Sequence, residues 1–236
     1  MLIGRLTPKQ QLSGKLVYGA SGRILPSDYY FGRGGAPEHE VILDVPQVAA
    51  ITKIKKDDEW YTIRSSLTLN GSQYIDTGYT PTNHTKIEID FTHGISENKF
   101  LFGSRTSGSS SDAFGLLYNA GITYPMFGSS QSSVSVRVPA NERHMVTLSQ
   151  EGCMLDDALI KSFSEMSFTS ALPIYIGGMN QNGSISNRIF DGEIYGVRLY
   201  ETSRFVRYMV PCARDSDSIN GLYDFAGNRF YPILTI

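Results

Sequence analysis

Apolar and polar residues alternate along several short stretches that follow Ser65. In 86–91 (KIEIDF) every second residue is apolar and the residues between them are charged. Successive side chains of a β-strand point to opposite faces, so this pattern places Ile87, Ile89 and Phe91 on one face and the charged residues on the other. The stretches 133–138 and 144–149 repeat the alternation. The pattern therefore predicts strands with one face turned towards a core.

Further runs of strand-forming residues follow at close spacing, separated by clusters of Gly, Asn, Ser and Asp that are typical of turns. These runs are 99–102, 114–118, 173–176, 193–200, 204–210 and 221–224. The chain has 236 residues, 41% of them hydrophobic, which suffices for one large β domain with a sizeable core. We therefore predict an all-β fold, a two-sheet antiparallel jelly-roll sandwich over residues 65–236.

Two segments are predicted to form hairpins. The apolar residues of 154–163 have a spacing that also suits an amphipathic helix, but the flanking runs are strands. We favour a hairpin that turns at Asp156 and Asp157, and the helix stays the alternative. Nearer the N-terminus, an apolar stretch over 48–54, a charged turn over 55–58 and a β-forming stretch over 60–63 predict a second hairpin.

Residues 1–64 differ in their sequence pattern from the rest of the chain. The unit LSGKL at 12–16 is echoed by ASGRI at 20–24, and each copy has too few apolar side chains to form a core alone. Two interpretations stay open: the segment packs on copies of itself in an oligomer, or it is a flexible linker rich in Gly and Ser. We expect residues 1–64 to be a small extended or β segment for attachment and oligomerisation.

Charge and composition argue against several classes of protein. A formal net charge of −2 lacks the concentrated positive field that nucleic-acid binding requires. No stretch approaches the ~18 consecutive apolar residues of a membrane span, and the N-terminus lacks the apolar run of a signal peptide. Cys153 and Cys212 lie far apart without metal-ligand spacing, which predicts two buried free thiols. We therefore expect synthesis in a cytoplasm, with no nucleic-acid partner and no membrane association.

A set of short motifs resembles the concanavalin A-like and laminin-G-like jelly-roll domains of bacterial and phage proteins. Those motifs are 73–79, 102–105 (an F-G-x-R element), 174–180 (an I-G-G-x-N strand end) and 192–200. The tail segments 205–212, 221–224 and 229–231 are similar to the L-V-R-D-F-V-P-C, G-L-Y-D and K-F-Y pattern of phage and prophage virion proteins of gut bacteria. The chain departs from that pattern at Tyr208, where an acidic or Asn residue is common.

Glu88 and Asp90 raise the question of catalysis, because laminarinase-type glycoside hydrolases of this fold carry an E-x-D-x-(x)-E strand. Retaining hydrolysis needs a nucleophilic carboxylate and an acidic carboxyl group about 5–5.5 Å apart. Glu88 and Asp90 share a face, but Thr92 and His93 stand where the third carboxyl group belongs. Without a proton donor, a rate contribution of about 10²–10⁴ is missing. We therefore predict a solvent-facing acidic stripe and no catalytic residue.

Motifs for other catalytic and metal sites are missing from the sequence. It has no Gly-x-Ser-x-Gly elbow, no His-Glu-x-x-His and no paired Cys/His spacing, and its four histidines stand in no catalytic constellation. Laminin-G relatives often hold a rim calcium with Asp, Asn and carbonyl oxygens, and Asp112, Asn180 and Asn182 lie in loops that such folds place at the rim. We favour the alternative that these side chains stabilise turns, and we expect no metal and no cofactor.

Carbohydrate binding needs aromatic platforms for pyranose faces and planar amide or guanidinium groups for hydroxyls. Side chains of these types fall in segments that the resemblance places at the rim of the sandwich. The predicted carbohydrate-binding residues are Tyr118, Asn119, Tyr124, Asn180, Gln181, Asn182 and Arg188. Each of them singly is also a common turn or sheet-edge residue, which is the alternative interpretation.

Together these observations predict a phage or prophage virion component in a tail, fibre or head-decoration position. Such a protein is assembled in the host cytoplasm and is exposed outside the cell after release. We expect its N-terminal segment to join other virion proteins and form a homo-oligomer, with a trimer favoured, while the jelly roll binds a bacterial surface polysaccharide multivalently. Two alternatives stay open: a purely structural capsid or tail protein that binds only virion proteins, and a laminarinase-type glycosidase.

Overall fold

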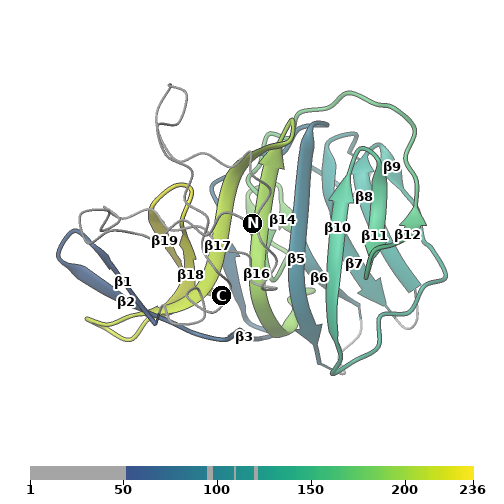
Figure 1. Cartoon of the computed structure of the whole chain (residues 1–236). Helices are drawn as coiled ribbons and strands as arrows, with labels where there is room; N and C mark the ends of the chain where they lie inside the picture. Colours follow the sequence, from purple (N-terminus) through teal and green to yellow (C-terminus); the bar gives the residue numbers. More distant parts are fainter. Residues whose placement is uncertain (1–51, 95–97, 109, 120–121) are drawn as a thin grey trace, which may run out of the picture.

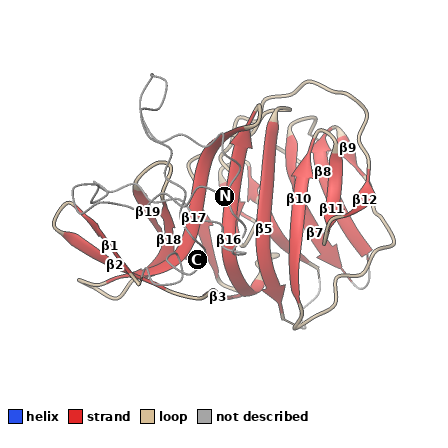
Figure 2. Ribbon diagram, viewed as in Figure 1, coloured by secondary structure: helices blue, strands red, loops and turns tan. Residues whose placement is uncertain are grey.

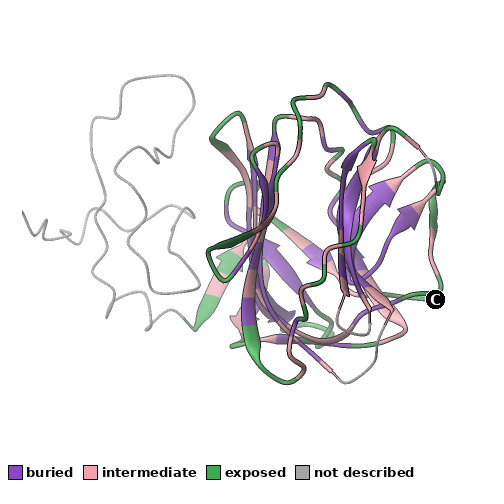
Figure 3. Cartoon of the chain, turned by 90° about the vertical axis from the view of Figure 1, so that its right-hand side faces the viewer, coloured by how far each residue is buried: buried purple, intermediate pink, exposed green. Residues whose placement is uncertain are grey.

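The computed structural model describes residues 52–94, 98–108, 110–119 and 122–236, and these ranges contain strands, turns and loops but no helix (Figures 1 and 2). The strands form two sheets, one of eleven and one of nine strands, which stack face to face (Figure 3). The predicted two-sheet antiparallel sandwich is therefore confirmed. Within the same ranges, no helix is long and apolar enough to cross a membrane.

The larger sheet runs in the order β1-β2-β17-β16-β5-β10-β11-β12. Its strands are β1 Lys53–Lys56, β2 Glu59–Ile63, β17 Arg204–Arg214, β16 Asp191–Glu201, β5 Thr85–His93, β10 Arg143–Ser149, β11 Gly152–Leu155 and β12 Ala158–Lys161. Three more strands join from the side. They are β3 Leu67–Asn70 on β16, β18 Asn220–Asp224 on β17, and β19 Arg229–Pro232 on β18. The long strands β5, β16 and β17 lie at its centre (Figure 1).

The smaller sheet runs in the order β20-β4-β13-β6-β7-β8-β9. Its strands are β20 Leu234–Thr235, β4 Gln73–Asp76, β13 Tyr175–Ile176, β6 Lys99–Arg105, β7 Ala113–Asn119, β8 Ile122–Gly128 and β9 Ser130–Gln131. A short hairpin of β14 Asn180–Gln181 and β15 Ser184–Ile185 lies beside β6, and β14 pairs with β6 in parallel.

The core lies between the two sheets and follows the alternation of the sequence. Ile87, Ile89 and Phe91 of β5 are 0% exposed and pack with apolar side chains of the smaller sheet such as Phe102 and Phe127. Each such side chain contributes about 1.5–3 kcal/mol by leaving water. The buried segments of the two layers face each other in Figure 3. Both cysteines are free and buried, as predicted.

Both predicted hairpins are present. The strands β11 and β12 are joined by Asp156 and Asp157, whose φ angles are 51° and 67°. Two successive residues with positive φ are typical of the tight turns that suit twisted hairpins, and Asp tolerates this region better than most residues. The helical alternative for 154–163 is therefore wrong. In the other hairpin, β1 and β2 are joined by Asp57 and Asp58, so the turn is shorter than the predicted 55–58.

The β1–β2 hairpin is part of the larger sheet. The end of β2 pairs with β17 at Cys212, Ala213 and Arg214. Tyr61 of β2 packs with Tyr223 of β18 in a second apolar cluster on this part of the sheet. The sequence analysis assigned residues 53–63 to the N-terminal segment, and the structure pairs them with the sandwich. Residues 1–51, including the repeated unit, lie outside the described residues, so the division at residue 64 stays a prediction.

Two predicted strands are shorter in the structure. In 133–138 only an isolated bridge forms, between Val134 and Thr123. Val136 N donates to Val134 O at 2.8 Å, so this N–H bonds within its own segment and not to β8, and the Thr123 hydroxyl donates to Val136 O at 2.7 Å. The alternation of buried and exposed side chains survives there without a ladder. Only the last two residues of 173–176 form a strand.

The G-L-Y-D segment of the tail has a structural role. A Cβ atom on Gly221 would lie 2.2 Å from Tyr231 O, so only glycine fits between β18 and β19 at this point. Asp224 is 0% exposed, and its carboxylate accepts hydrogen bonds from the backbone N–H groups of Tyr208, Ala226 and Gly227 at 2.8–3.0 Å. The Tyr208 side chain is 2% exposed and packs in the second apolar cluster, so it does not lie at the rim.

Candidate functional site

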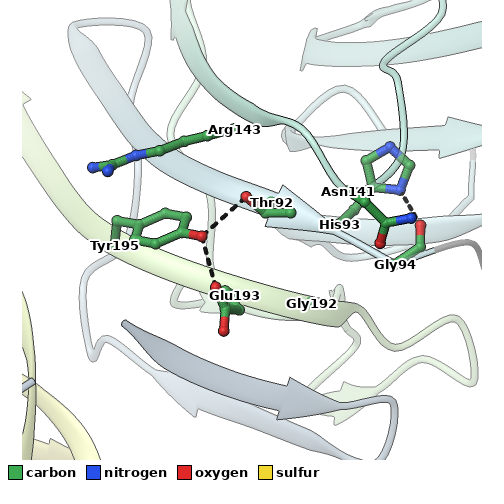
Figure 4. Close-up of a pocket in the computed structure, with 8 residues that line it drawn as sticks. All are labelled: Thr92, His93, Gly94, Asn141, Arg143, Gly192, Glu193 and Tyr195. Carbon is green, nitrogen blue, oxygen red and sulfur yellow. Dashed lines mark hydrogen bonds between the residues drawn. The ribbon is translucent and has the colours of Figure 1, made fainter. Parts of the chain in front are cut away.

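A hollow of about 440 Å³ lies on the outer face of the larger sheet, where β5 ends and β16 and β10 begin (Figure 4). Its lining residues are Thr92, His93, Gly94, Asn141, Arg143, Gly192, Glu193 and Tyr195. Since Phe91 points into the core, its neighbour Thr92 points outwards, and the hollow faces away from the smaller sheet. Apart from the two glycines these residues are polar or charged, and two of them, His93 and Tyr195, carry aromatic rings.

Strand register brings the lining residues together. Thr92 pairs with Arg143 on one side and with Glu193 on the other. A β-bulge between Ile194 and Gly196 inserts Tyr195 as an extra residue in β16. Bulges re-aim side chains beside functional sites, and this one places the Tyr195 ring next to Thr92 and Glu193 on the outer face.

A network of contacts fixes these side chains. The Tyr195 hydroxyl donates to Glu193 Oε2 at 2.6 Å and lies 3.1 Å from Thr92 Oγ1 (Figure 4). Its hydrogen bond to Glu193 raises the pKa of Tyr195, so the phenol stays protonated at neutral pH. The Arg143 guanidinium lies 4.1 Å from the centre of the Tyr195 ring, a cation–π contact. The outcome is an aromatic ring and a guanidinium group held against each other at the hollow.

Arg143 is also paired with Asp90. Its Nε and Nη2 atoms donate to the two carboxylate oxygens of Asp90 at 2.8 and 2.7 Å, which is the strong bidentate geometry. This pairing raises the pKa of Arg143. The Arg143 side chain is 51% exposed. Among the described residues, Arg143 Nη1, Glu193 Oε1 and the Asn141 amide have no side-chain partner and can meet a ligand.

The floor of the hollow is rigid. The His93 ring packs on the Tyr118 ring with centroids 4.4 Å apart, and its nitrogens lie 2.6 Å from Gly94 O and 2.9 Å from Val138 O. The backbone N–H of Asn141 donates to His93 O at 2.9 Å. The turn before β10 is therefore held against the end of β5.

Glu88 does not belong to a solvent-facing acidic stripe. Its carboxylate accepts hydrogen bonds from Lys86 at 2.9 Å and from Arg198 and Tyr200 at 3.0 Å. Burial alone would raise the pKa of Glu88, but Lys86 and Arg198 outweigh it and hold that pKa below its usual value. Asp90 is 5% exposed and paired with Arg143, and Thr92 is bound to Tyr195. The predicted stripe is instead a row of half-buried ion pairs, in which Glu88 is a poor proton donor.

Two of the predicted carbohydrate-binding residues are enclosed rather than at the rim. Tyr118 is 4% exposed because its ring packs between His93 and Phe190. Asn180 is 1% exposed, and its amide bridges Pro173 O and Gly183 N at 2.9 and 3.1 Å. Neither side chain presents a surface to a sugar, because side chains at these positions close the core and a turn.

Of the other five predicted residues, four belong to the smaller sheet and its hairpin, and Arg188 lies between β15 and β16. Tyr124 of β8 packs on the outer apolar cluster that contains Phe100 and Leu117. Gln181 accepts a hydrogen bond from Arg105 Nη2 at 2.9 Å. The remaining three are half-buried Asn119 and exposed Asn182 and Arg188. None of these residues lines the hollow, and their role in binding stays a prediction.

The calcium candidates take part in turns. Asp112 Oδ1 accepts hydrogen bonds from the backbone N–H and the hydroxyl of Thr106 at 3.2 and 2.9 Å. Asn182 has φ 54° in the turn between β14 and β15. In the described ranges, no group of three or more His, Cys, Asp or Glu side chains is placed to hold a metal ion.

The hollow was not predicted from the sequence. The strands that carry Thr92 and Glu193 were recognised, but their proximity was not, since the register between strands far apart in the chain is not visible locally. The signal that could have found them is Glu193-Ile194-Tyr195, an acidic and an aromatic residue at alternate positions of a strand.

No protein-family model matches the chain, and no curated protein matches it either. Among solved structures, a candidate carbohydrate-binding protein from Bacteroides ovatus is similar, with a TM-score of 0.51 and 13% identity over 74% of this chain and 60% of that one. The fold is a concanavalin-like jelly roll. The chain therefore matches about three-fifths of the length of the Bacteroides protein.

Two other solved domains are similar at lower scores. The carbohydrate-binding module CBM40 of the Ruminococcus gnavus IT-sialidase, bound to α2,3-sialyllactose, has a TM-score of 0.46 and 17% identity over 58% of this chain and 89% of that one. Domains LG4-5 of the mouse laminin α1 chain have a TM-score of 0.44 and 20% identity over 61% of this chain and 44% of that one.

Proposed function

We propose that the chain is a carbohydrate-binding protein without catalytic activity and that it binds sugar in the hollow beside Tyr195. The observation that supports this most is the combination of Arg143 Nη1, Glu193 Oε1 and the Asn141 amide around one flat surface. A sugar hydroxyl both donates and accepts, so it can be read by a guanidinium or amide N–H together with a carboxylate oxygen. The outer face of the Arg143–Tyr195 stack offers a planar platform for a pyranose ring.

Preorganisation adds to this argument. Tyr195 is fixed by Thr92 and Glu193, and Arg143 is fixed by Asp90, so little side-chain freedom is lost when a ligand binds. Glu88 and Asp90 are already neutralised by basic side chains, which leaves no free pair of a nucleophile and an acid near the hollow among the described residues. The arrangement therefore suits holding a sugar rather than cleaving it.

A binding assay with the full chain on an immobilised glycan panel tests the proposal. We expect Asn141→Ala and Tyr195→Ala to weaken binding at least about tenfold, because each removes a contact at the centre of the site. Tyr124→Ala, which alters the smaller sheet, serves as the matched control and should leave binding unchanged. Loss of binding in Tyr124→Ala or Arg188→Ala, with the hollow variants unaffected, would move the site to the other sheet.

We further propose that this binding attaches a phage or prophage virion to a bacterial surface polysaccharide. The tail pattern over 205–231, with its similarity to virion proteins, supports this role. Several copies acting together would turn weak single sites into firm attachment, and we favour a trimer joined through residues 1–64. Mass spectrometry of purified particles from a strain that carries the gene, together with the mass of the full chain in solution, tests this role. A monomer that is missing from particles would refute it.

A further inference from the structure

The basic group of the hollow is already matched by a buried acid. Among the described residues that line the hollow, Arg143 is the only Lys or Arg, and two of its donor nitrogens bind Asp90. Asp90 is 5% exposed, so a ligand carboxylate that took over this guanidinium would leave the Asp90 charge buried and unpaired. Breaking a buried pair in this way is strongly unfavourable. Arg143 can therefore offer Nη1 to a neutral oxygen but is a poor receptor for an anion.

Glu193 adds a negative charge that no cation balances within the part of the chain that the structure describes. Its Oε2 atom accepts a hydrogen bond from the neutral Tyr195 hydroxyl at 2.6 Å, and it forms no ion pair with any described residue. Counted over these three described side chains, Arg143, its partner Asp90 and Glu193 have a net charge of −1. Glu193 Oε1 is suited to accept a hydrogen bond from a sugar hydroxyl and repels an anionic substituent.

The floor does not reverse this balance. His93 lies beneath the hollow, and Asp191 is close by, since a Cβ atom on Gly94 would lie 3.0 Å from Asp191 Oδ2. Both nitrogens of the His93 ring face carbonyl oxygens. His93 therefore presents no free ring nitrogen to an anionic ligand.

We propose that the hollow selects uncharged sugars through their hydroxyl groups and rejects sugars that carry a carboxylate, sulfate or phosphate. The inference rests on the proposed carbohydrate-binding function and names its ligand class. Hydroxyls would donate to Glu193 Oε1 and accept from Arg143 Nη1 and the Asn141 amide. An acidic sugar would gain no free cation from the described lining residues and would face the charge of Glu193.

Matched glycan pairs test this selectivity. The full chain is titrated with oligosaccharides that differ by one acidic group: N-acetyllactosamine with and without α2,3-linked sialic acid, and glucose oligomers with and without one glucuronic acid. We expect the neutral member of a bound pair to bind at least about fivefold more tightly at low salt, and this gap to shrink as salt screens the repulsion. Thermal unfolding of every variant checks that the fold is intact.

Glu193→Gln supplies the decisive comparison. We expect it to reduce the ratio of the affinity for the neutral glycan to that for the acidic glycan by about fivefold. The substitution removes the negative charge of Glu193 while keeping an amide oxygen at this position. Glu151→Gln, an equal change of charge in the exposed turn between β10 and β11, should leave the ratio unchanged. Equal or tighter binding of the acidic members by the unmodified chain would overturn the selectivity while keeping the proposed function. Failure to bind any member, with binding absent across the glycan panel, would overturn both.

Discussion

Glu201, the last residue of β16, binds the segment 79–85 that leads into β5. Its carboxylate accepts hydrogen bonds from the hydroxyls of Tyr79, Thr82 and Thr85 at 2.5, 2.6 and 2.8 Å. Burial alone would raise the pKa of Glu201, but these hydrogen bonds outweigh it and hold the pKa below the usual 4.5. Burial and the bond to Glu201 raise the pKa of Tyr79 to about 12, so its hydroxyl stays a donor.

Glu201→Gln should destabilise the protein and change its response to acid. We expect a loss of about 2 kcal/mol at neutral pH, because the amide replaces a charged acceptor with a weaker one. Since the folded-state pKa lies below the unfolded value, this contribution is present above pH 4.5 and disappears as the pH falls through the folded-state pKa. Denaturant unfolding from pH 7 to pH 3 measures the difference, which should shrink on acidification. A difference that stays constant over this range would contradict the account.

At the scale of elements, strands and hairpins were predictable because their signals are local. The period-two alternation in β5 and the Asp156-Asp157 turn depend only on neighbouring residues. The prediction was wrong for 133–138, because the Val136 N–H bonds to Val134 O within the same segment and does not extend a ladder with β8. The hollow was not predictable for a different reason. It depends on the register of β5, β10 and β16 and on the bulge at Tyr195, which are set by tertiary packing.

Gly192 tests the packing between β5 and β16 beside the hollow. It has φ 151°, and a Cβ atom there would lie 2.2 Å from Thr92 O and 2.8 Å from the His93 Cα atom. Gly192→Ala should therefore destabilise the protein by about 3 kcal/mol and weaken sugar binding, because the strands must move apart. Gly108→Ala is the control, since its Cβ atom would meet nothing within 4 Å. Calorimetric unfolding and glycan titration measure both variants; equal stability of the two would refute this description.

At the scale of the whole molecule, β17 connects the sandwich to the β1–β2 hairpin. Its first part pairs with β16, and its last part pairs with both β2 and β18. Asp215, just beyond β17, binds Lys53 at 2.7 Å and Thr62 at 2.6 Å. The jelly roll was recognisable from its motifs. The pairing of residues 53–63 with this sheet was not, because the regular alternation of apolar and polar residues begins only after residue 64.

Removing the hairpin should cost stability. We expect a chain of residues 65–236 to be less stable than one of residues 52–236 by at least about 3 kcal/mol, because Tyr61 and Ile63 no longer cover the aromatic cluster on β17 and β18. Urea unfolding of the two chains measures the difference. Equal urea midpoints of the two chains would show that residues 65–236 form the sandwich without the hairpin, as the predicted division at residue 64 implies.

The most direct test of the central claim is a crystal structure of the full chain soaked with a neutral oligosaccharide that it binds in solution. We predict density for a pyranose ring in the hollow, within hydrogen-bond distance of Arg143 Nη1, Glu193 and Asn141, with Asp90 still paired to Arg143. Sugar density on the smaller sheet beside Tyr124 and Arg188, with the hollow empty, would contradict the account.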